Sequence, residues 1–528
     1  MKRLILSIHI TTILLTVPIF MCGQNVASSE LLSRHHIGKE TLTKGMLKFA
    51  FADDGYTAIV SSAVEWSYNT MQTSKYELLD TLVIPAEIVQ NGRRYAVVAI
   101  ATDGFSNCNS FRHLVIQDGI RHIYKNAFMG CSALESIYIP ASIERINGNP
   151  FTHCSELKSI VVDTTNVHYT SKGETANAII DIAEKRLVSG CSATSIPDFV
   201  EIIGDCAFYG QQNLHSLHLP PSIKKIEGYA FADSGLEDLK IPSSTSNIGQ
   251  GIFAGCNNLT HIDVVRNNRT YNSARGYNVI IETATNNLVA ACSKSKIPKN
   301  TKKIANSAFA DLHGLRSVKI PPNVSVISPL AFSGCKNLVK LSVAHKNQTF
   351  DSRSRCNAII ETATKTLIVA CSATTIPSNI NAIGQSAFSK VVVPHTLVLP
   401  EGIKEIGDFA YEQCHTLQSI VLPSTLKTLG KGAFAKCLGL KNVIIQPHSI
   451  TQLKQWMFAD CISLRQLHLP EGCDSIHPNA LIGCVNLQLL THGDAYTNIA
   501  LDFADGFKQK ETYESDKLYQ LSSGSSIK

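Results

Sequence analysis

The chain has 528 residues, of which 17% are charged and 44% are hydrophobic, and its formal net charge is +6. This length is too great for one compact core, so several domains or a repeat array are expected. The apolar content excludes wholesale disorder, and the small net charge without a dense basic stripe does not indicate a nucleic-acid binder.

The N-terminus has the pattern of an export signal. Two basic residues precede a mostly apolar run over residues 4–20, and Gly23 is a small residue before a cleavage point. We therefore predict a signal peptide over residues 1–23 and an exported protein, either secreted or held at the outer cell surface. The alternative is that Cys22 carries a lipid anchor, which the bulky residues before it disfavour. No later run of about 18 apolar residues could span a membrane.

The two ends of the remaining chain differ from its centre. Residues 24–45 show no periodicity and are interpreted as a leader. Residues 46–100 are expected to form an N-terminal β cap, because the end of a repeat array exposes an apolar edge. Within this cap, Asn91 and Gly92 form a dipeptide that is typical of a hairpin turn. Residues 491–528 are predicted to be a C-terminal cap followed by a polar tail.

Residues 101–490 contain an internal repeat, in which an aromatic residue recurs at steps of about 23 residues, a period found among repeat proteins. A leucine takes its place at the end, so the positions are Phe105, Phe128, Phe151, Phe208, Phe231, Phe253, Phe309, Phe332, Phe388, Tyr411, Phe434, Phe458 and Leu481. A period of about 20–29 residues is typical of leucine-rich-repeat solenoids. We therefore predict a repeat solenoid of this class.

One repeat shows how the residues would build a coil. Phe128 and Cys131 belong to an apolar set at helical spacing, which predicts a short helical turn. The alternation over residues 137–139 then predicts a strand with Tyr138 pointing outward, and Pro140 ends it. Because each strand would pair with the next, we expect a long parallel β-sheet along one flank.

Three steps between the aromatic positions are more than twice as long as the others, namely Phe151 to Phe208, Phe253 to Phe309 and Phe332 to Phe388. The additional residues share one pattern of two apolar runs, which begins at residues 178–181, 279–282 and 358–361. We interpret these steps as longer coils, each with an extra β-hairpin, which brings the expected total to about sixteen coils.

The 16 cysteines would ordinarily indicate disulfides in an exported chain. Nine of them, however, stand three residues after the repeated aromatic or its substitute: Cys108, Cys131, Cys154, Cys256, Cys335, Cys414, Cys437, Cys461 and Cys484. A residue that recurs at one buried position is most simply a small core hydrophobe. We therefore expect free thiols, and the sequence has no C-x-x-C pair that would indicate a zinc or redox site.

The repeat follows the pattern I-P-x-x-[IV]-x-x-I-G-x-x-A-F-x-x-C-x-x-L-x-x-[IV]-x-[IL]-P, as at residues 406–410 and 429–434. This pattern resembles the BspA-type leucine-rich-repeat family over roughly residues 76–490. The long coils with Asn166 and Asn268 also resemble that family. The resemblance implies an exported surface protein that adheres to host matrix proteins or to other cells.

The sequence contains no phosphate-binding loop, no metalloprotease helix motif and no nucleophile elbow. We therefore predict a protein that is not an enzyme and needs no cofactor. A catalytic site assembled from separate coils is a third hypothesis, which turnover in a broad hydrolase panel would reveal.

The outward strand positions are the predicted binding surface, since neighbouring strands about 4.8 Å apart would align them into stripes. Candidate ligand-binding residues are Tyr138, His218, Asp238, Lys240, His261, Asp263 and Lys319. The main hypothesis is recognition of a protein partner, with no role for nucleic acid. The alternative is a glycan-binding module for nutrient capture, which is disfavoured because Tyr138 is the only aromatic residue in these stripes. Polar side chains that merely solvate the sheet would explain the same pattern.

The most specific local hypothesis concerns Asp238, His261 and Asp263, which fall on successive coils. Two carboxylates and an imidazole are able to hold a divalent ion. Pairing of Asp238 with His261 or Lys240 explains the same residues without a ligand, so no metal site is assigned.

Overall fold

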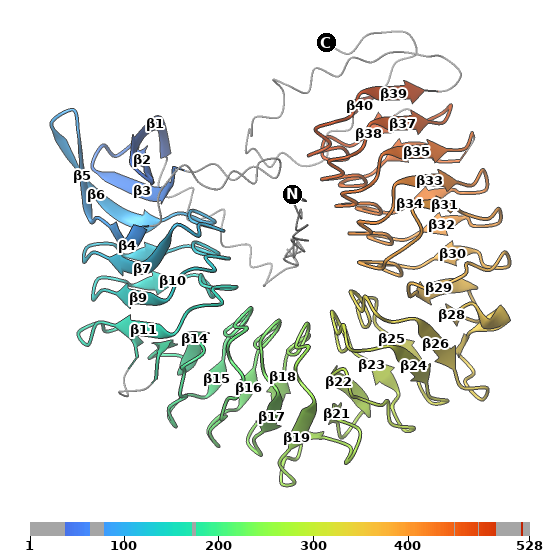
Figure 1. Cartoon of the computed structure of the whole chain (residues 1–528), viewed down its shortest axis with the longest axis horizontal. Helices are drawn as coiled ribbons and strands as arrows, with labels where there is room; N and C mark the ends of the chain where they lie inside the picture. The colour runs from blue at the N-terminus through green and yellow to red at the C-terminus, as the bar shows by residue number, and fades with distance from the viewer. Residues whose placement is uncertain are drawn as a thin grey trace, which may run out of the picture.

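The structure is a computed structural model that describes residues 37–63, 79–171, 176–447, 449–473, 475–492 and 519–520. The predicted signal peptide, most of the leader and most of the C-terminal tail lie outside the described residues. The chain forms an arc of stacked coils whose two ends are the tips of two limbs (Figure 1). The prediction of a repeat solenoid, made from the spacing of the aromatic residues, is confirmed.

Each coil has three sides. The first side carries the predicted strands, called here the long strands: β4 (Leu79–Ile84), β7 (Phe111–Ile116), β9 (Ser136–Ile139), β11 (Ser159–Val162), β17 (Asp238–Ile241), β19 (His261–Val264), β24 (Ser317–Ile320), β26 (Lys340–Val343), β31 (Thr396–Val398), β33 (Ser419–Leu422), β35 (Asn442–Ile445), β37 (Gln466–Leu469) and β39 (Leu489–His492). Their outward side chains form the strand face.

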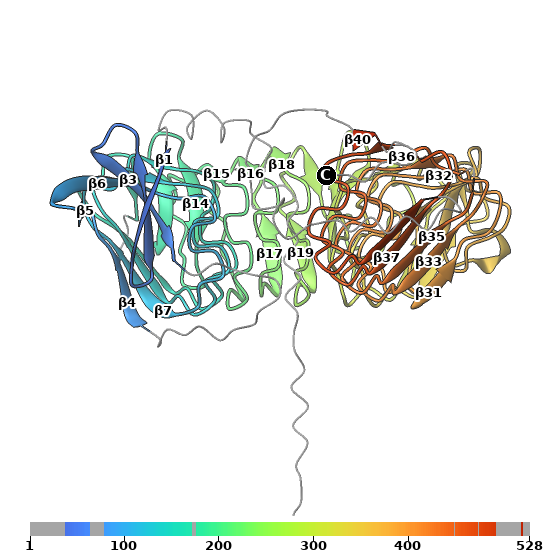
Figure 2. The ribbon, with the colours of Figure 1, turned by 90° about the horizontal axis from the view of Figure 1, so that it is seen from above.

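A second row of two-residue parallel strands, which the sequence did not reveal, occupies another side of the coils. It consists of β8 (His122–Ile123), β10 (Arg145–Ile146), β15 (Ile202–Ile203), β16 (Lys225–Ile226), β18 (Asn247–Ile248), β23 (Lys303–Ile304), β25 (Val326–Ile327), β30 (Ala382–Ile383), β32 (Glu405–Ile406), β34 (Thr428–Leu429), β36 (Gln452–Leu453) and β38 (Ser475–Ile476). Figure 2 shows β15, β16 and β18 on the opposite side of the arc from β17 and β19.

The third side, here the turn side, carries the repeated aromatic residues. Where short helical turns are predicted, these segments form single hydrogen-bonded turns, as in the bond from Cys131 N to Phe128 O at 3.2 Å. Residues with a left-handed backbone, Asn126 (φ 56°) and Gly130 (φ 74°), bracket the turn and stop it from continuing as a helix. In the described residues the only helix is η1 (Arg353–Arg355).

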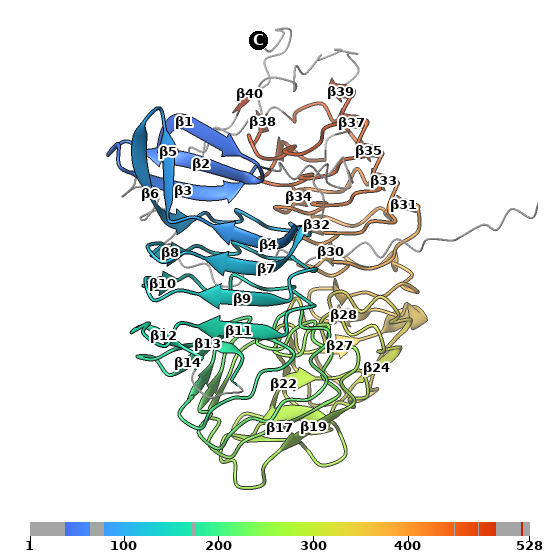
Figure 3. The same cartoon turned by 60° about the vertical axis from the view of Figure 1, so that its left-hand side comes forward.

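The three predicted long coils do contain β-hairpins. Each adds a three-stranded antiparallel unit: β12 (Tyr169–Thr170), β13 (Ala178–Asp181) and β14 (Arg186–Gly190); β20 (Tyr271–Asn272), β21 (Val279–Glu282) and β22 (Asn287–Ala291); β27 (Phe350–Asp351), β28 (Ile359–Glu361) and β29 (Thr366–Val369). Figure 3 shows β12, β13 and β14 directly after β10 and β11.

These hairpins interrupt the long-strand sheet, so the expectation of one continuous sheet is wrong. The long strands form separate parallel sheets in the orders β11-β9-β7-β4, β17-β19, β24-β26 and β31-β33-β35-β37-β39. The break arises because the first hairpin strand of a long coil packs beside the preceding long strand, as β13 does beside β11. Residues 216–219 consequently form no strand.

The long coils also explain the arc. On the turn side the long coils contribute no additional residues to the stack. His153 N therefore donates directly to Tyr209 O at 2.8 Å, although a long coil lies between these two residues in the sequence. The strand sides receive an additional hairpin at the same place. Each long coil is therefore a wedge, and the side without additional residues becomes the inner, concave side of the arc (Figure 1).

The core is a column of stacked aromatic rings. The ring centroids of Phe105 and Phe128 are 5.2 Å apart, and those of Phe128 and Phe151 are 5.3 Å apart. The cysteine column lies beside it, and the thiol of Cys131 donates to the backbone oxygen of Phe105 in the preceding coil at 3.1 Å. The nine cysteines of this column are free thiols, as predicted. A small residue with an S–H donor thus links adjacent coils.

The N-terminal cap is a sheet of β1 (Ile37–Lys44), β2 (Leu47–Ala52), β3 (Thr57–Ser62), β5 (Glu87–Gln90) and β6 (Arg93–Ile100), which joins the short strands through β8. Asn91 and Gly92 form the predicted hairpin turn with φ of 51° and 76°. Strand β1 lies within the predicted leader, because a cap strand pairs with its hairpin neighbour and need not follow the repeat period. At the other end, β40 (Tyr519–Gln520) pairs with β38.

Candidate binding surfaces

The strand face carries most of the residues predicted to bind a ligand, but they do not form one site. Tyr138 lies half-buried on β9, and its hydroxyl donates to Asp163 Oδ2 at 2.5 Å. Hydrogen bonds from Thr165 and from Tyr138 lower the pKa of Asp163 to about 2. Tyr138 therefore anchors the chain at the start of the first long coil.

The charged residues of the middle of the arc lie on β17 and β19. The register sets Asp238 opposite His261 and Lys240 opposite Asp263. Asp263 is half-buried and accepts a hydrogen bond from Ser273 Oγ at 3.3 Å, whereas the other three side chains are exposed. No ion pair joins these four, and no described residues form a group of three ligating side chains that could hold a metal ion. The hypothetical ion site is therefore not assembled here.

The remaining two candidates are placed apart. His218 is exposed, but it lies in the segment that forms no strand. Lys319 is exposed on β24, opposite Ser342 on β26. The second long coil separates β24 from β19, so the sheet that carries Lys319 is not the sheet that carries Asp263.

Two ladders of mostly aliphatic side chains flank this charged centre on the strand face. The C-terminal ladder consists of Val398, Val421 and Ile444, which are direct neighbours in the register of β31, β33 and β35. Val398 is 66% exposed and Ile444 is 43% exposed. The N-terminal ladder runs from Val83 through Val115 and Tyr138 to Val161.

The turn side carries a set of charged residues that the sequence analysis missed. They stand two residues after the repeated aromatic: His153, Asp233, Asp311 and Lys390. The ammonium of Lys390 contacts both carboxylate oxygens of Asp311, at 3.0 and 2.9 Å, and His153 Nδ1 lies 3.5 Å from Asp233 Oδ2. The signal that could have found them is the alternation of these positions with Gly210, Gly255 and Gly334.

Burial changes the acidity of this set. Burial lowers the pKa of His153 to about 4, since the charged imidazolium would lose its hydration. Burial, and then the nearby charge of Asp311, raise the pKa of Asp233 to about 6. Glu412, one position before the same column, is almost fully buried, and burial raises its pKa to about 7. The pKa values of the Asp233 and Glu412 carboxyl groups therefore lie closer to neutral pH than those of ordinary carboxyl groups.

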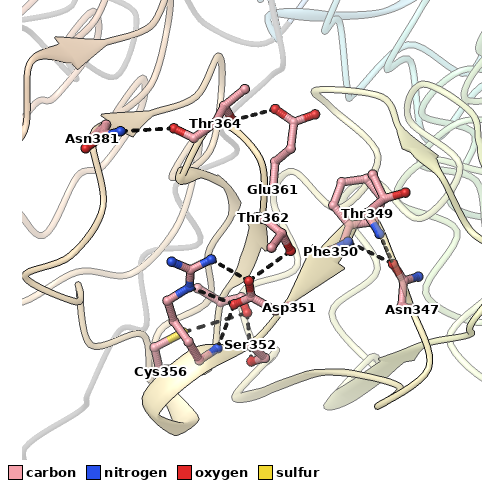
Figure 4. A network of polar contacts seen from close by, with 12 residues as sticks. Asn347, Thr349, Phe350, Asp351, Ser352, Cys356, Glu361, Thr362, Thr364 and Asn381 are labelled. Atoms are coloured by element: carbon pink, nitrogen blue, oxygen red, sulfur yellow. Dashed lines mark hydrogen bonds and ion pairs between the residues drawn. The ribbon is translucent and has the colours of Figure 1, made fainter.

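An arrangement that recurs within this chain holds each long coil to the coil before it. In the third long coil, Asn347 Nδ2 donates to Pro321 O and Val324 O. Asn347 Oδ1 accepts from Thr349 N and Phe350 N (Figure 4). Asn166 and Asn268 make the corresponding four bonds in the other two. We call these four hydrogen bonds the asparagine clamp. They explain why each long coil has an asparagine at this position.

A second network beside the clamp in the third long coil fixes the next strand. The guanidinium of Arg353 donates to both oxygens of Asp351, and Thr362 Oγ1 donates to Asp351 Oδ2 at 2.9 Å (Figure 4). These bonds, with that of Arg353 first, lower the pKa of Asp351. The polar groups of this network are satisfied by one another, which indicates a structural role.

Short repeated coils with parallel strands, a stacked aromatic column and inward leucine and isoleucine side chains define a leucine-rich-repeat solenoid protein. The chain belongs to the family described as "BspA type Leucine rich repeat region". The family model has six copies of the repeat and matches the chain over residues 94–181, 188–287, 280–391 and 364–488. The predicted family is thereby confirmed. In the described part of the chain, no helix is long and apolar enough to cross a membrane.

Several solved structures are similar to this chain. A leucine-rich cell surface protein from Faecalibacterium prausnitzii is 24% identical, with 78% of this chain and 95% of that chain covered and a TM-score of 0.37. A leucine-rich repeat protein from Bacteroides ovatus is 18% identical, with 85% and 94% covered and a TM-score of 0.23. The pneumococcal vaccine antigen PcpA is 17% identical, with 81% and 87% covered and a TM-score of 0.29. No curated protein matches this chain.

Proposed function

We propose that this protein is an exported, adhesin-like binding protein without enzymatic activity, which recognises a protein partner through its strand face. The observation that carries the proposal is the C-terminal aliphatic ladder. Val398, Val421 and Ile444 stand on adjacent strands about 4.8 Å apart and point away from the core. Aligned, exposed aliphatic side chains are typical of a surface that another protein covers.

The residues around this ladder suit a protein partner. The neighbouring outward column carries Thr396, Ser419, Asn442 and Gln466, which offer hydroxyl and amide groups for hydrogen bonds. An apolar centre with a polar rim is the composition of ordinary protein–protein interfaces. The charged centre of the strand face, with Asp238, Lys240 and Lys319 exposed, would contribute specificity and faster association.

Export and surface location belong to the same proposal. They rest on the N-terminal signal pattern and on membership of the BspA-type family. Expression in a Gram-negative host, followed by mass spectrometry of the N-terminus, tests the signal. A mature chain that begins at Gln24 supports cleavage after Gly23, and an acylated Cys22 would establish the lipid anchor instead.

Binding is tested with the purified protein and immobilised matrix proteins. The variants Val398→Lys and Ile444→Lys place a charge on the ladder without touching the core, and we expect each to weaken saturable binding at least tenfold. Val326→Lys is the matched control, because Val326 is 47% exposed on the short strand β25, away from the strand face. Binding that survives both ladder variants and the combined change of Lys240→Ala and Asp263→Ala would refute the strand face as the binding surface.

A further inference from the structure

A groove of about 310 Å³ lies on the short-strand side of the C-terminal limb, lined by residues of β30, β32 and β34 and of the turns after them. Figure 1 shows these three strands next to one another. Its floor is formed by three glycines, Gly384, Gly407 and Gly430, one after each short strand. A Cβ on Gly407 would lie 2.6 Å from Gln385 N, so glycine is required for the close approach of adjacent coils. Because these three positions have no side chain, the groove runs across several coils.

Polar side chains line this groove together with the three glycines. Glu405 and Asp408 provide carboxylates, Gln385 provides an amide, Thr366 and Thr428 provide hydroxyls, and Lys454 provides an ammonium group. Glu405 is exposed, and Asp408 Oδ1 accepts the backbone N–H of Lys431 at 2.8 Å, which fixes the direction of that carboxylate. Donors and acceptors at this density suit a ligand that carries many hydroxyl groups.

Two aromatic residues lie close in sequence to these groups. Trp456 follows Lys454 by two residues, and its side chain is 40% exposed although a tryptophan is usually well buried. Phe409 follows Asp408 and occupies the same repeat position two coils earlier. A Cβ on Gly432, which stands between them, would overlap the Phe409 ring, so this ring lies across the intervening coil. Phe409 and Trp456 thus each follow a residue that lines the polar groove, Asp408 and Lys454, by one or two positions.

We propose that this groove binds a neutral oligosaccharide. Glu405, Asp408 and Gln385 bind hydroxyl groups of one sugar unit, and the exposed indole of Trp456 packs against the C–H face of a unit further along the oligosaccharide. The volume is at the lower end of the range of about 300–1,000 Å³ that small-molecule sites occupy, which fits a short stretch of chain. The two carboxylates disfavour acidic sugars, because like charges repel.

This site is independent of the proposed protein-binding surface. The groove is on the short-strand side, whereas the aliphatic ladder is on the strand face of the same coils. A glycan site was disfavoured by the sequence because only Tyr138 is aromatic among the strand-face columns. The aromatic residues Phe409 and Trp456 instead occur in the turns that follow short strands, outside the strand-face columns.

The test uses the whole protein and an array of immobilised neutral oligosaccharides of two to six hexose or N-acetylhexosamine units, followed by calorimetry with the strongest hit. We expect saturable binding that weakens at least tenfold in Trp456→Ala and in Glu405→Gln. Ala382→Gln fills the groove from an outward short-strand position and should abolish binding. Val326→Gln is the matched control, since Val326 occupies the same position of β25 and does not line the groove.

Each result either supports or refutes the groove as the binding site. Loss of binding in the three groove variants, with the control within twofold of the parent and all melting curves alike, supports the site. No binding of any neutral oligosaccharide at millimolar concentration refutes the proposal. Binding that Ala382→Gln leaves unchanged refutes it as well, because the sugar would then occupy another surface.

Discussion

The Lys390 ammonium lies 2.9 Å from the Asp311 carboxylate although the two residues are 79 positions apart. They belong to coils that are not adjacent on the turn side, because the coil of Gly334 stands between them. A Cβ on Gly334 would overlap Asp311 Oδ1. The glycine therefore makes room for a contact that skips a coil, and Gly210 does the same between His153 and Asp233.

Replacing Gly334 tests this relationship. Gly334 has φ of +72°, so Gly334→Ala adds a left-handed backbone cost of about 1–2 kcal/mol to the overlap with Asp311. We expect a lower unfolding free energy in urea than for the parent. Gly276→Ala is the control, since Gly276 has φ of +84° but no atom within 4 Å of its Cβ position. Equal losses in the two variants would show that the space around Asp311 is unimportant.

We expect Glu412 to make the folded protein more stable in mild acid than at neutral pH. Burial raises its pKa from 4.5 to about 7, so the folded chain holds this proton more tightly than the unfolded chain does. The stabilisation of the folded state by this tighter proton binding is fully present below about pH 4.5 and is lost as the pH rises through about 7. The shift corresponds to roughly 3 kcal/mol.

The variant Glu412→Gln removes this dependence. We expect it to be more stable than the parent at pH 8 and similar to it at pH 4.5, because the neutral amide replaces a carboxylate that is 3% exposed. Chemical denaturation of both proteins at the two pH values measures the difference, so that other titrating groups, such as His153 and Asp233, cancel. A variant that is destabilised equally at both values would contradict the assignment.

The asparagine clamp predicts that substitutions of two adjacent residues lower the unfolding free energy by very different amounts. Asn268 donates to Pro242 O and Thr245 O and accepts from two backbone N–H groups, whereas Asn267 is exposed. Asn268→Ala leaves these groups without partners and should lower the unfolding free energy by about 2–4 kcal/mol. Asn267→Ala should change it by less than about 0.5 kcal/mol. Similar unfolding curves for the two variants would refute the clamp.

The cysteine column predicts unreactive thiols in the folded protein. Cys256 is fully buried, and burial raises its pKa to about 12, so its thiolate is scarce. Alkylation with iodoacetamide, mapped by mass spectrometry, should modify Cys256 only after denaturation. Cys108, which is less buried, serves as the internal comparison and should react first. Equal native labelling of both thiols would contradict the packing described here.

Several features could be predicted because they depend on neighbours in sequence. The spacing of Phe128 and Cys131, which recurs in coil after coil, identifies which side chains face the core. The alternation around Tyr138 identifies the strands, and the lengths of the steps identify the long coils. Side-chain direction within a strand or turn follows from local backbone geometry, so one chain segment is sufficient to infer it.

Other features arise only when coils stack. The wedge shape of the long coils and the bond between His153 and Tyr209 depend on residues more than two repeats apart in the sequence. So do the Asp311–Lys390 ion pair and the groove that Gly384, Gly407 and Gly430 open. The breaks in the long-strand sheet depend on the packing of a hairpin strand beside the preceding long strand, as with β13 and β11. The repeat period assigned residues to columns, but distances between columns and the curvature of the arc were decided by packing. The sequence by itself therefore determined the solenoid and its family, and only the tertiary structure decided which side chains meet, because those contacts form across coils and not along the chain.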